Sequence, residues 1–189
     1  MEKKTANLED AELLAAFAQA ESRERAFGQL VEKYQQRVYF LVRKMVIDHD
    51  DADDVVQEVF IKVWKSLGRF EGGSQLFTWL YRIATNECLR FLEKNKKKRF
   101  WISMGDAGNE LANKLETSPH ISGDEVQLRL QKSLLKLPDK QRLVFNLKYF
   151  EDLKYDEIAE ITGTSIGSLK ASYHHAVKKI EEDIKTQLS

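Results

Sequence analysis

Apolar residues recur every three or four positions along most of this chain, which is the spacing of one face of an α-helix. The longest such stripe predicts a helix over residues 22–47. Shorter stripes predict further helices over residues 8–20, 55–67, 76–93, 124–136 and 139–149, with Tyr149 expected to face inward in the last of them. The pattern predicts an all-α fold.

The helical periodicity is lost between residues 101 and 123, where Gly, Ser, Asn and Pro are scattered. We therefore expect two small helical domains, at residues 1–95 and 124–189, joined by a flexible linker at residues 96–123.

The second domain ends in a pattern that predicts two short helices joined by a tight turn. The first helix spans residues 155–162, and Gly163 stands where a left-handed backbone is expected. Ser165 can cap the second helix, whose Leu169 faces inward. This arrangement is typical of the helix-turn-helix of a four-helix DNA-binding domain. The polar face of the second helix carries the candidate DNA contacts, namely Ser165, Ser168, Lys170, Ala171, His174, His175 and Lys178. A surface helical hairpin with a solvated charged face is the alternative.

Five aspartates lie between residues 48 and 54, directly before the helix predicted over residues 55–67. Acidic residues at a helix start complement its dipole, and Asp51 or Asp53 is the expected cap. A calcium loop would need regular ligand spacing and a glycine, and the segment has neither, so we predict no metal site. The exposed face that includes Gln57, Glu58 and Ile61 is expected to dock on a basic partner, with a merely solvated face as the alternative.

A glycine-containing loop at residues 68–75 precedes the helix predicted over residues 76–93. Together they bring aromatic rings close to two cations and an amide, namely Phe70, Phe77, Trp79 and Tyr81 beside Arg82, Asn86 and Arg90. This mixture suits single-stranded DNA, whose unstacked bases need an aromatic face and edge contacts. Rings of this kind also occur as simple core residues. Cys88 is expected to be a small core residue and not a nucleophile.

Composition narrows the classes of function. The chain of 189 residues has 30 basic and 30 acidic residues, so a DNA-binding protein of this kind must segregate its charges along the chain. A single cysteine excludes an internal disulfide and a cysteine-based zinc site. No apolar run is long enough to span a membrane and no signal-peptide core is present, so we expect a cytoplasmic protein. Phosphate-binding glycine loops, HExxH and nucleophile–histidine patterns are absent, which argues against an enzyme and predicts no cofactor.

Two motifs now carry a resemblance. The segments DADDVVQEVFIKVWKSL and FTWLYRIATNECLRFLEK resemble region 2 of the bacterial sigma-70 family. The segment LPDKQRLVFNLKYFEDLKYDEIAEITGTSIGSLKASYHHAVKKI resembles region 4. With these two domains and only a short linker between them, the chain resembles a group IV, extracytoplasmic-function (ECF) sigma factor over most of residues 20–184.

The resemblance implies a role for each surface. The acidic helix would dock on the clamp helices of the largest RNA polymerase subunit through Asp50, Asp51, Asp53, Asp54, Gln57, Glu58 and Ile61. The loop and the following helix would capture the −10 element as a single strand through Phe70, Glu71, Gly72, Gly73, Ser74, Phe77, Arg82, Asn86 and Arg90. The helix-turn-helix would read the −35 element as duplex. Family members also bind the polymerase flap and are usually held inactive by an anti-sigma factor. The run LKAS departs from the family, because many members carry an arginine where Ser172 stands.

A second hypothesis stays open at this point. A stand-alone regulator could dimerise through residues 20–67 and bind a palindromic duplex site through the same helix-turn-helix. It would not explain the aromatic loop and the helix that follows it.

Overall fold

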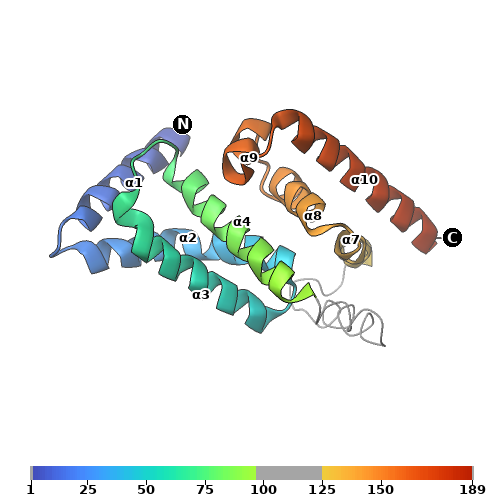
Figure 1. Cartoon of the computed structure of the whole chain (residues 1–189), viewed down its shortest axis with the longest axis horizontal. Helices are drawn as coiled ribbons and strands as arrows, with labels where there is room; N and C mark the ends of the chain where they lie inside the picture. The colour runs from blue at the N-terminus through green and yellow to red at the C-terminus, as the bar shows by residue number, and fades with distance from the viewer. Residues whose placement is uncertain (1, 97–124, 189) are drawn as a thin grey trace.

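The structure, a computed structural model, describes residues 2–96 and 125–188, and within those ranges every regular element is helical. Figure 1 shows the elements in chain order. They are α1 (Glu2–Ala18), α2 (Arg23–Val46), α3 (His49–Ser66), the short 3-10 helix η1 (Leu67–Arg69), α4 (Leu76–Lys94), α7 (Glu125–Leu135), α8 (Asp139–Phe145), the π-helical turn η2 (Asn146–Phe150), α9 (Tyr155–Thr162) and α10 (Ile166–Leu188). The all-α prediction is confirmed, and the predicted linker lies outside the described residues except for Lys96.

The N-terminal half is built around α2, against which α1, α3 and α4 all pack. The apolar stripe predicted for this helix is its buried face, formed by Ala26, Leu30, Tyr34, Val38, Leu41, Val42, Met45 and Val46. The buried Asp10 of α1 contacts this face, and its carboxylate accepts hydrogen bonds from the Tyr34 hydroxyl and from Lys33 Nζ. Those bonds satisfy the buried carboxylate and fix α1 on α2.

The acidic segment does not precede α3 but forms its first turns. The cap is Asp48, whose Oδ1 accepts hydrogen bonds from the backbone N–H groups of Asp50 and Asp51 at 3.1 and 3.2 Å. The predictions of a helix start at residue 55 and of a cap at Asp51 or Asp53 are therefore wrong. Ala52 and Val55 are buried at helical spacing, so the periodicity of the helix already begins inside the acidic run.

The C-terminal half departs from a regular helix at one place. The helix predicted over residues 139–149 ends as α8 at Phe145 and continues as the π turn η2. A π turn inserts one extra residue per turn and rotates the side chains that follow it. Asn146 and Leu147 consequently point inward, while Tyr149 is 56% exposed, contrary to the expectation that it would be buried.

The helix-turn-helix forms as predicted. α9 has the predicted bounds, and Gly163 ends it in the left-handed conformation with φ 68°. A side chain at that φ would be strained, which explains the glycine. Ser165 caps α10 weakly, since its hydroxyl accepts a 3.4 Å hydrogen bond from the backbone N–H of Ser168.

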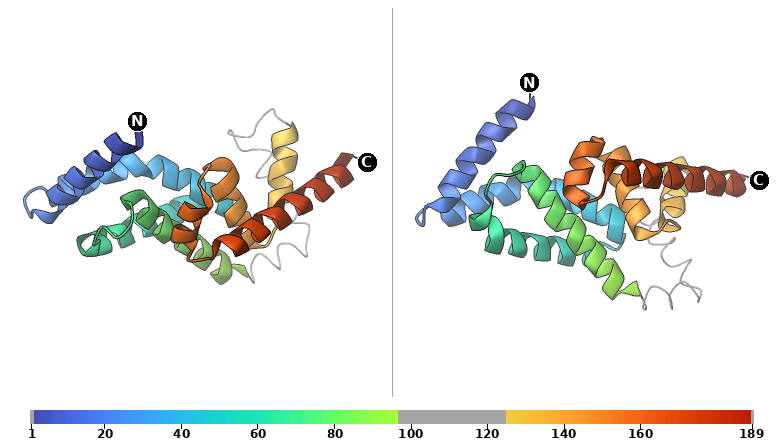
Figure 2. Two further views of the ribbon diagram at one scale, coloured as in Figure 1. Left: turned by 90° about the horizontal axis from the view of Figure 1, so that it is seen from above. Right: turned by 45° about the horizontal axis from the view of Figure 1, so that its top comes forward.

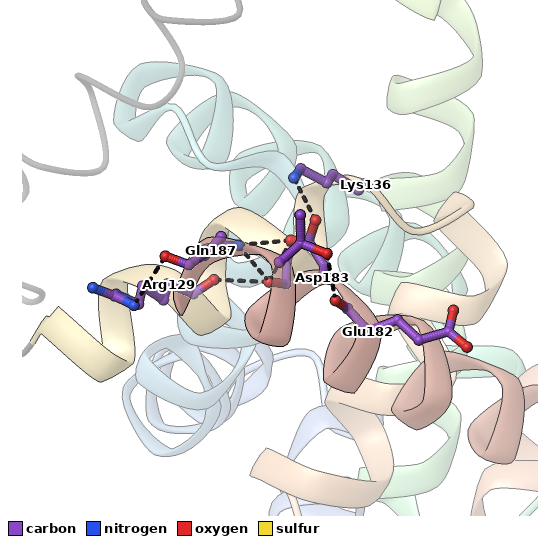
Figure 3. A network of polar contacts seen from close by, with 7 residues as sticks. Arg129, Lys136, Glu182, Asp183 and Gln187 are labelled. Carbon is purple, nitrogen blue, oxygen red and sulfur yellow. Dashed lines mark hydrogen bonds and ion pairs between the residues drawn. The ribbon is translucent and has the colours of Figure 1, made fainter. Parts of the chain in front are cut away.

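The far end of α10 is held by a polar network with α7 (Figure 3). The Asp183 carboxylate accepts hydrogen bonds from Lys136 Nζ, the Ser133 hydroxyl and the Gln187 amide. The Ser133 hydroxyl is itself 3.0 Å from the Arg129 carbonyl oxygen. These bonds hold the C-terminal part of α10, and thereby the whole helix, at a fixed angle on its domain.

The two halves share one hydrophobic cluster. Its members in α2 and α4 include Met45, Leu80 and Cys88, and its members in the C-terminal half include Leu147 and Ile158. In Figures 1 and 2, α9 lies beside α4, and α8 lies beside the end of α2. A second, smaller cluster belongs to the C-terminal half alone and includes Leu134, Phe145 and Ile180.

Candidate polymerase- and DNA-binding surfaces

The outer face of α3 presents the acidic residues to solvent. Exposed positions are Asp50, Asp53, Asp54, Gln57, Glu58 and Ile61, and Asp51 is half-buried. Asp53 is 3.7 Å from His49 Nδ1, which also lies 2.9 Å from the Tyr39 hydroxyl. The face therefore combines a strong negative charge with one exposed apolar residue, as the sequence predicted.

Sequence reasoning missed Trp64, which extends this face by one turn. Trp64 is 38% exposed and Ile61 is 39% exposed, so the two form an apolar end to the acidic stripe. The inner edge of the indole packs against Phe17 and Phe27, at 5.4 and 4.9 Å between ring centroids. Its spacing of three residues from Ile61 was the signal that could have revealed it.

The loop before α4 packs on this helix through two aromatic rings. Phe70 lies on Trp79 with 5.3 Å between centroids, and both rings are only partly buried. Gly72 adopts a φ of 75°, while Gly73 is exposed and Ser74 is half-buried. Phe77, at the start of α4, is half-buried under the Arg37 guanidinium, 4.6 Å from its ring centroid. The Phe77 ring is also packed against Tyr81, with 4.0 Å between centroids. Partly exposed aromatic rings can stack on bases.

Arg82, Asn86 and Arg90 are all exposed and follow one another at intervals of four residues, so they form a single stripe along α4. Arg90 pairs with the Glu87 carboxylate at 3.6 Å, and Lys62 of α3 binds the same carboxylate. Arg82 Nε and Nη2 both donate to the carbonyl oxygen of Glu160, which belongs to α9. The stripe predicted for single-stranded DNA thus touches the C-terminal half.

The prediction that the Tyr81 ring belongs to this surface is wrong. Its ring was expected among the rings near Arg82, but it is fully buried and its hydroxyl donates to Glu151 at 2.9 Å. Burial raises the pKa of Tyr81, and the Glu151 carboxylate raises it further. Tyr81 is therefore a neutral structural donor and offers no face to a base.

Cys88 lies on the inner side of α4. It is 0% exposed, and burial raises the pKa of its thiol to about 12. A neutral, inaccessible thiol is a core residue and not a nucleophile, as predicted. Within residues 2–96 and 125–188, no three His, Cys, Asp or Glu side chains gather as a ligand set for a metal.

The outer face of α10, together with Ser165 directly before it, brings together all seven predicted DNA contacts of the helix-turn-helix. Every one of them is exposed, namely Ser165, Ser168, Lys170, Ala171, His174, His175 and Lys178. On the opposite side Leu169, Ala176 and Ile180 are buried. α10 is therefore fixed by its apolar side and leaves its N-terminal half open along the length that a major groove accepts.

Sequence reasoning also missed Tyr155, at the start of α9. Two cations lie near its half-buried ring, with Lys170 Nζ at 5.8 Å and Lys148 Nζ at 5.7 Å from its centroid. These contacts hold two positive charges beside the helix-turn-helix.

No helix among the described residues combines the length and apolar character needed to cross a membrane.

Comparison with protein families identifies both halves. Residues 30–98 match the family model described as Sigma-70 region 2, and residues 127–180 match the model described as Sigma-70, region 4. The first segment holds the acidic face and the stripe of α4, and the second holds the helix-turn-helix.

Individual proteins agree with the family models. The chain is 30% identical to the ECF RNA polymerase sigma factor SigW of Bacillus subtilis over 168 residues, which cover 85% of this chain and 89% of SigW. Among solved structures, it is similar to CnrH in complex with the cytosolic domain of CnrY, with a TM-score of 0.68, 25% identity, and coverage of 94% of this chain and 98% of CnrH. The fold is also that of the sigma factor RpoE bound to the anti-sigma factor NepR from Bartonella quintana. The TM-score is 0.62 and the identity 24%, and the match covers 84% of this chain and 96% of RpoE. Two sigma regions, in order and over most of the chain, therefore make this protein a member of the ECF family of bacterial RNA polymerase sigma factors.

Proposed function

We propose that this sigma factor divides promoter recognition among three surfaces. The acidic face of α3 binds core RNA polymerase, the loop and stripe of α4 hold the melted −10 strand, and the outer face of α10 reads the −35 duplex. The observation that supports this division best is the exposure of every predicted contact on α10, together with the stripe of Arg82, Asn86 and Arg90 on a separate helix.

The −10 surface is suited to unpaired DNA. Opening a duplex costs on the order of 1.4 kcal/mol per base step, so the protein must hold the freed bases. In our proposal Phe70 and Phe77 provide aromatic faces, Gly72, Gly73 and Ser74 let the loop approach the strand, and Arg82, Asn86 and Arg90 contact phosphates and base edges.

The −35 surface is suited to intact duplex. In our proposal the N-terminal half of α10 enters the major groove, with Ser165, Ser168, Lys170, Ala171 and His174 nearest the base edges. His175 and Lys178 lie further along and contact the backbone. Ser172, which is half-buried, stands where many family members have arginine, so His174 and His175 replace part of that contact.

The polymerase-binding face is suited to a basic partner. Its seven residues would meet the clamp helices of the largest subunit by charge complementarity around one apolar contact at Ile61. We propose that the polymerase flap holds the C-terminal half, so that polymerase sets the distance between the two DNA-binding surfaces. Polymerase and promoters are cytoplasmic in bacteria, and we propose the cytoplasm as the place of action.

We also propose that an inhibitor protein binds this sigma factor. The sigma factor RpoE, which has the same fold as this chain, was solved in complex with the anti-sigma factor NepR from Bartonella quintana. We propose that an anti-sigma factor binds this chain too and competes with core polymerase.

Run-off transcription tests the proposal directly. Purified core polymerase is incubated with this protein on a library of genomic promoters, and the expected result is RNA that starts at discrete sites only when the protein is present. The competing hypothesis, a dimeric regulator, predicts no such RNA and a symmetric footprint on duplex DNA without polymerase.

A further inference from the structure

We propose that Glu87 of α4 is a positioning residue of the −10 surface, holding Arg90 and Lys62 at a fixed spacing, and that Lys62 of α3 is a further contact to the melted strand. This inference rests on the proposed role of α4 in binding that strand. It extends the −10 surface from one helix to two, and it gives a reason for a carboxylate among cations that bind DNA.

Glu87 is a negative charge beside a surface proposed to bind a polyanion. It directly follows Asn86, and Arg90 lies three residues later on the same side of α4. The Glu87 side chain is only 14% exposed. A carboxylate in this place repels phosphates and has lost much of its hydration, so it is unfavourable unless cations bind it.

Cations from two helices bind the Glu87 carboxylate. Its Oε1 accepts a hydrogen bond from Lys62 Nζ of α3, and its Oε2 lies 3.6 Å from Arg90 Nη1 of α4. α3 and α4 pack against each other (Figure 1), and the first of these contacts joins them. One partly buried anion therefore fixes the positions of two cations, and the three charges together leave one positive charge for DNA.

Both cations keep donors for the strand. The side chain of Arg90 is 71% exposed and that of Lys62 is 34% exposed. A guanidinium has five N–H donors and an ammonium has three, so the contacts with Glu87 use only part of each set. Long side chains lose rotamer freedom when they bind a ligand, and side chains that are already held lose less. Glu87 therefore favours a strand whose phosphates match the spacing of the two cations.

The charge of α3 changes sign along the helix, which separates Lys62 from the polymerase-binding face. The exposed acidic residues end at Glu58, and Lys62 follows one turn later. Lys65 and Arg69, further along, are exposed and basic. An acidic surface for polymerase and a basic surface for the strand thus share one helix, and the basic part is the one that reaches α4 through Glu87.

The test uses two effects of opposite sign. Glu87→Gln keeps the shape of the side chain and removes its charge, so electrostatics alone predicts tighter binding of every DNA strand. Loss of positioning predicts weaker binding of the −10 strand. Glu93→Gln is the matched control, because Glu93 is an exposed carboxylate of α4, three residues after Arg90, that pairs with Lys96.

Strand binding is measured with holoenzyme by fluorescence anisotropy. The two labelled probes are the non-template −10 strand of a promoter found by run-off transcription and an oligothymidine of the same length. We expect Glu87→Gln to bind the −10 strand about fivefold more weakly than the parent, and Glu93→Gln to bind it at least as tightly as the parent. With oligothymidine the two variants should not differ. Tighter or unchanged binding of the −10 strand by Glu87→Gln would overturn the proposal.

A double-mutant cycle separates positioning from a purely structural role. When Lys62 and Arg90 are both alanine, Glu87→Gln should no longer weaken binding of the −10 strand, because no cations remain to be held. A loss that persists in this background shows that Glu87 acts through the fold and contradicts the positioning role. Urea unfolding of each variant, followed by circular dichroism, confirms that the proteins compared are folded.

Lys62→Ala tests the new contact without Glu87 and without polymerase. Binding of oligothymidine by the free protein should lose about 0.7 from its slope against salt concentration, since one phosphate contact to a single strand is removed. Arg25→Ala, which removes an exposed cation of α2, should leave the slope as in the parent. An unchanged slope in Lys62→Ala would exclude α3 from strand binding.

The outcomes separate this inference from the proposed function. Promoter-dependent RNA from the parent, with Glu87→Gln binding the −10 strand as the parent does, refutes the positioning role and leaves the sigma activity standing. If the parent produces no promoter-dependent RNA, the proposed function fails, and the salt slope of Lys62→Ala alone decides whether α3 and α4 form one surface for single strands.

Discussion

The two helices proposed to touch DNA, α4 and α10, differ in how much of their surface belongs to the protein itself. The proposed contacts on α10 lie on its outer face, and the contacts they make stay within the C-terminal half. The Ser165 and Ser168 hydroxyls are 2.9 Å apart, Lys170 lies over the Tyr155 ring, and Lys178 pairs with Glu182 at 4.0 Å. On α4, Arg90 pairs locally with Glu87, but Arg82 donates to the Glu160 carbonyl oxygen of the other half. In the proposed function, α10 meets intact duplex, which is always present, whereas α4 meets a melted strand, which exists only after polymerase acts.

The two helices also differ in the hydrophobic clusters to which they belong. α10 is anchored partly by the small cluster of the C-terminal half alone, which holds Ala176 and Ile180. α4 belongs to the large cluster that joins both halves, in which Leu80, Ala84 and Cys88 are all 0% exposed. Leu169, in the N-terminal half of α10, also belongs to the large cluster, so only the later part of α10 packs apart from the contact between the halves.

The largest expected effect comes from Ile158→Ala in α9. Ile158 is 0% exposed within the shared cluster, so removing its side chain should lower the free energy of unfolding by about 3 kcal/mol. All three tryptophans, at positions 64, 79 and 101, precede the C-terminal half. If the halves unfold as one unit, tryptophan fluorescence in urea will report the loss although the substitution lies in α9.

Ile180→Ala is the matched control, because Ile180 lies in the separate cluster of the C-terminal half. It should shift the transition seen by circular dichroism more than the one seen by tryptophan fluorescence. Equal shifts in both probes for both variants would mean that the two clusters are not separate cooperative units.

The sequence predicted much of this fold because helical periodicity is a local property. The stripes of α2 and α10, the turn at Gly163 and the exposed contacts of α10 follow from spacing alone. The start of α3 was misplaced because five aspartates resembled a loop, although Ala52 already continues the buried stripe. Tyr149 was misjudged because a π turn, which shifts the register by one residue, leaves no mark in the apolar pattern.

The exposed residues of the candidate sites could be predicted from the sequence, but their contacts with distant segments could not. Which residues are exposed on α3 and α10 could be read from one helix at a time. The partners of Tyr81 and Arg82 could not, because Glu151 and the Glu160 carbonyl are contributed by segments about 70 residues further along the chain. Contacts of that separation depend on how two halves meet, and periodicity carries no information about that.

The second prediction tests whether α4 and α10 bind different forms of DNA. In holoenzyme, Arg82→Ala and Asn86→Ala should each reduce promoter opening about tenfold, since each removes a contact to the melted strand. Binding to the −35 duplex should be unchanged. Permanganate footprinting measures the opening and a band-shift assay with a −35 duplex measures the binding. A parallel loss of both activities would contradict the assignment of α4 to the melted strand.

The third prediction addresses α10 alone. Lys170→Ala should weaken −35 duplex binding about fivefold and reduce the slope of affinity against salt concentration by about one, because one phosphate contact is lost. Tyr155→Leu removes the ring that Lys170 faces and should produce a smaller loss with the same slope. An unchanged slope in Lys170→Ala would remove Lys170 from the set of phosphate contacts.

The smallest expected effect is a dependence of stability on pH at the far end of α10. Burial raises the pKa of Asp183, but the hydrogen bonds from Lys136, Ser133 and Gln187 outweigh it, and the pKa lies below its ordinary value. The unfolded carboxyl therefore binds a proton more tightly than the folded one. Its contribution to stability is complete above the unfolded pKa, near 3.9 for an ordinary aspartate, and is lost as pH falls through the lowered folded pKa.

Asp183→Asn tests this dependence, because it keeps the shape of the side chain and abolishes its charge. At neutral pH the variant should be less stable than the parent by about 1 kcal/mol, measured by urea unfolding followed by circular dichroism. The difference should shrink once the pH falls below the ordinary carboxyl value. The proposed duplex contacts lie in the N-terminal half of α10, far from Asp183 along the helix, so −35 binding should weaken only at a pH where the C-terminal end of α10 unfolds. A stability difference that stays constant down to strongly acidic pH would show that the network of Figure 3 does not depend on the charge of Asp183.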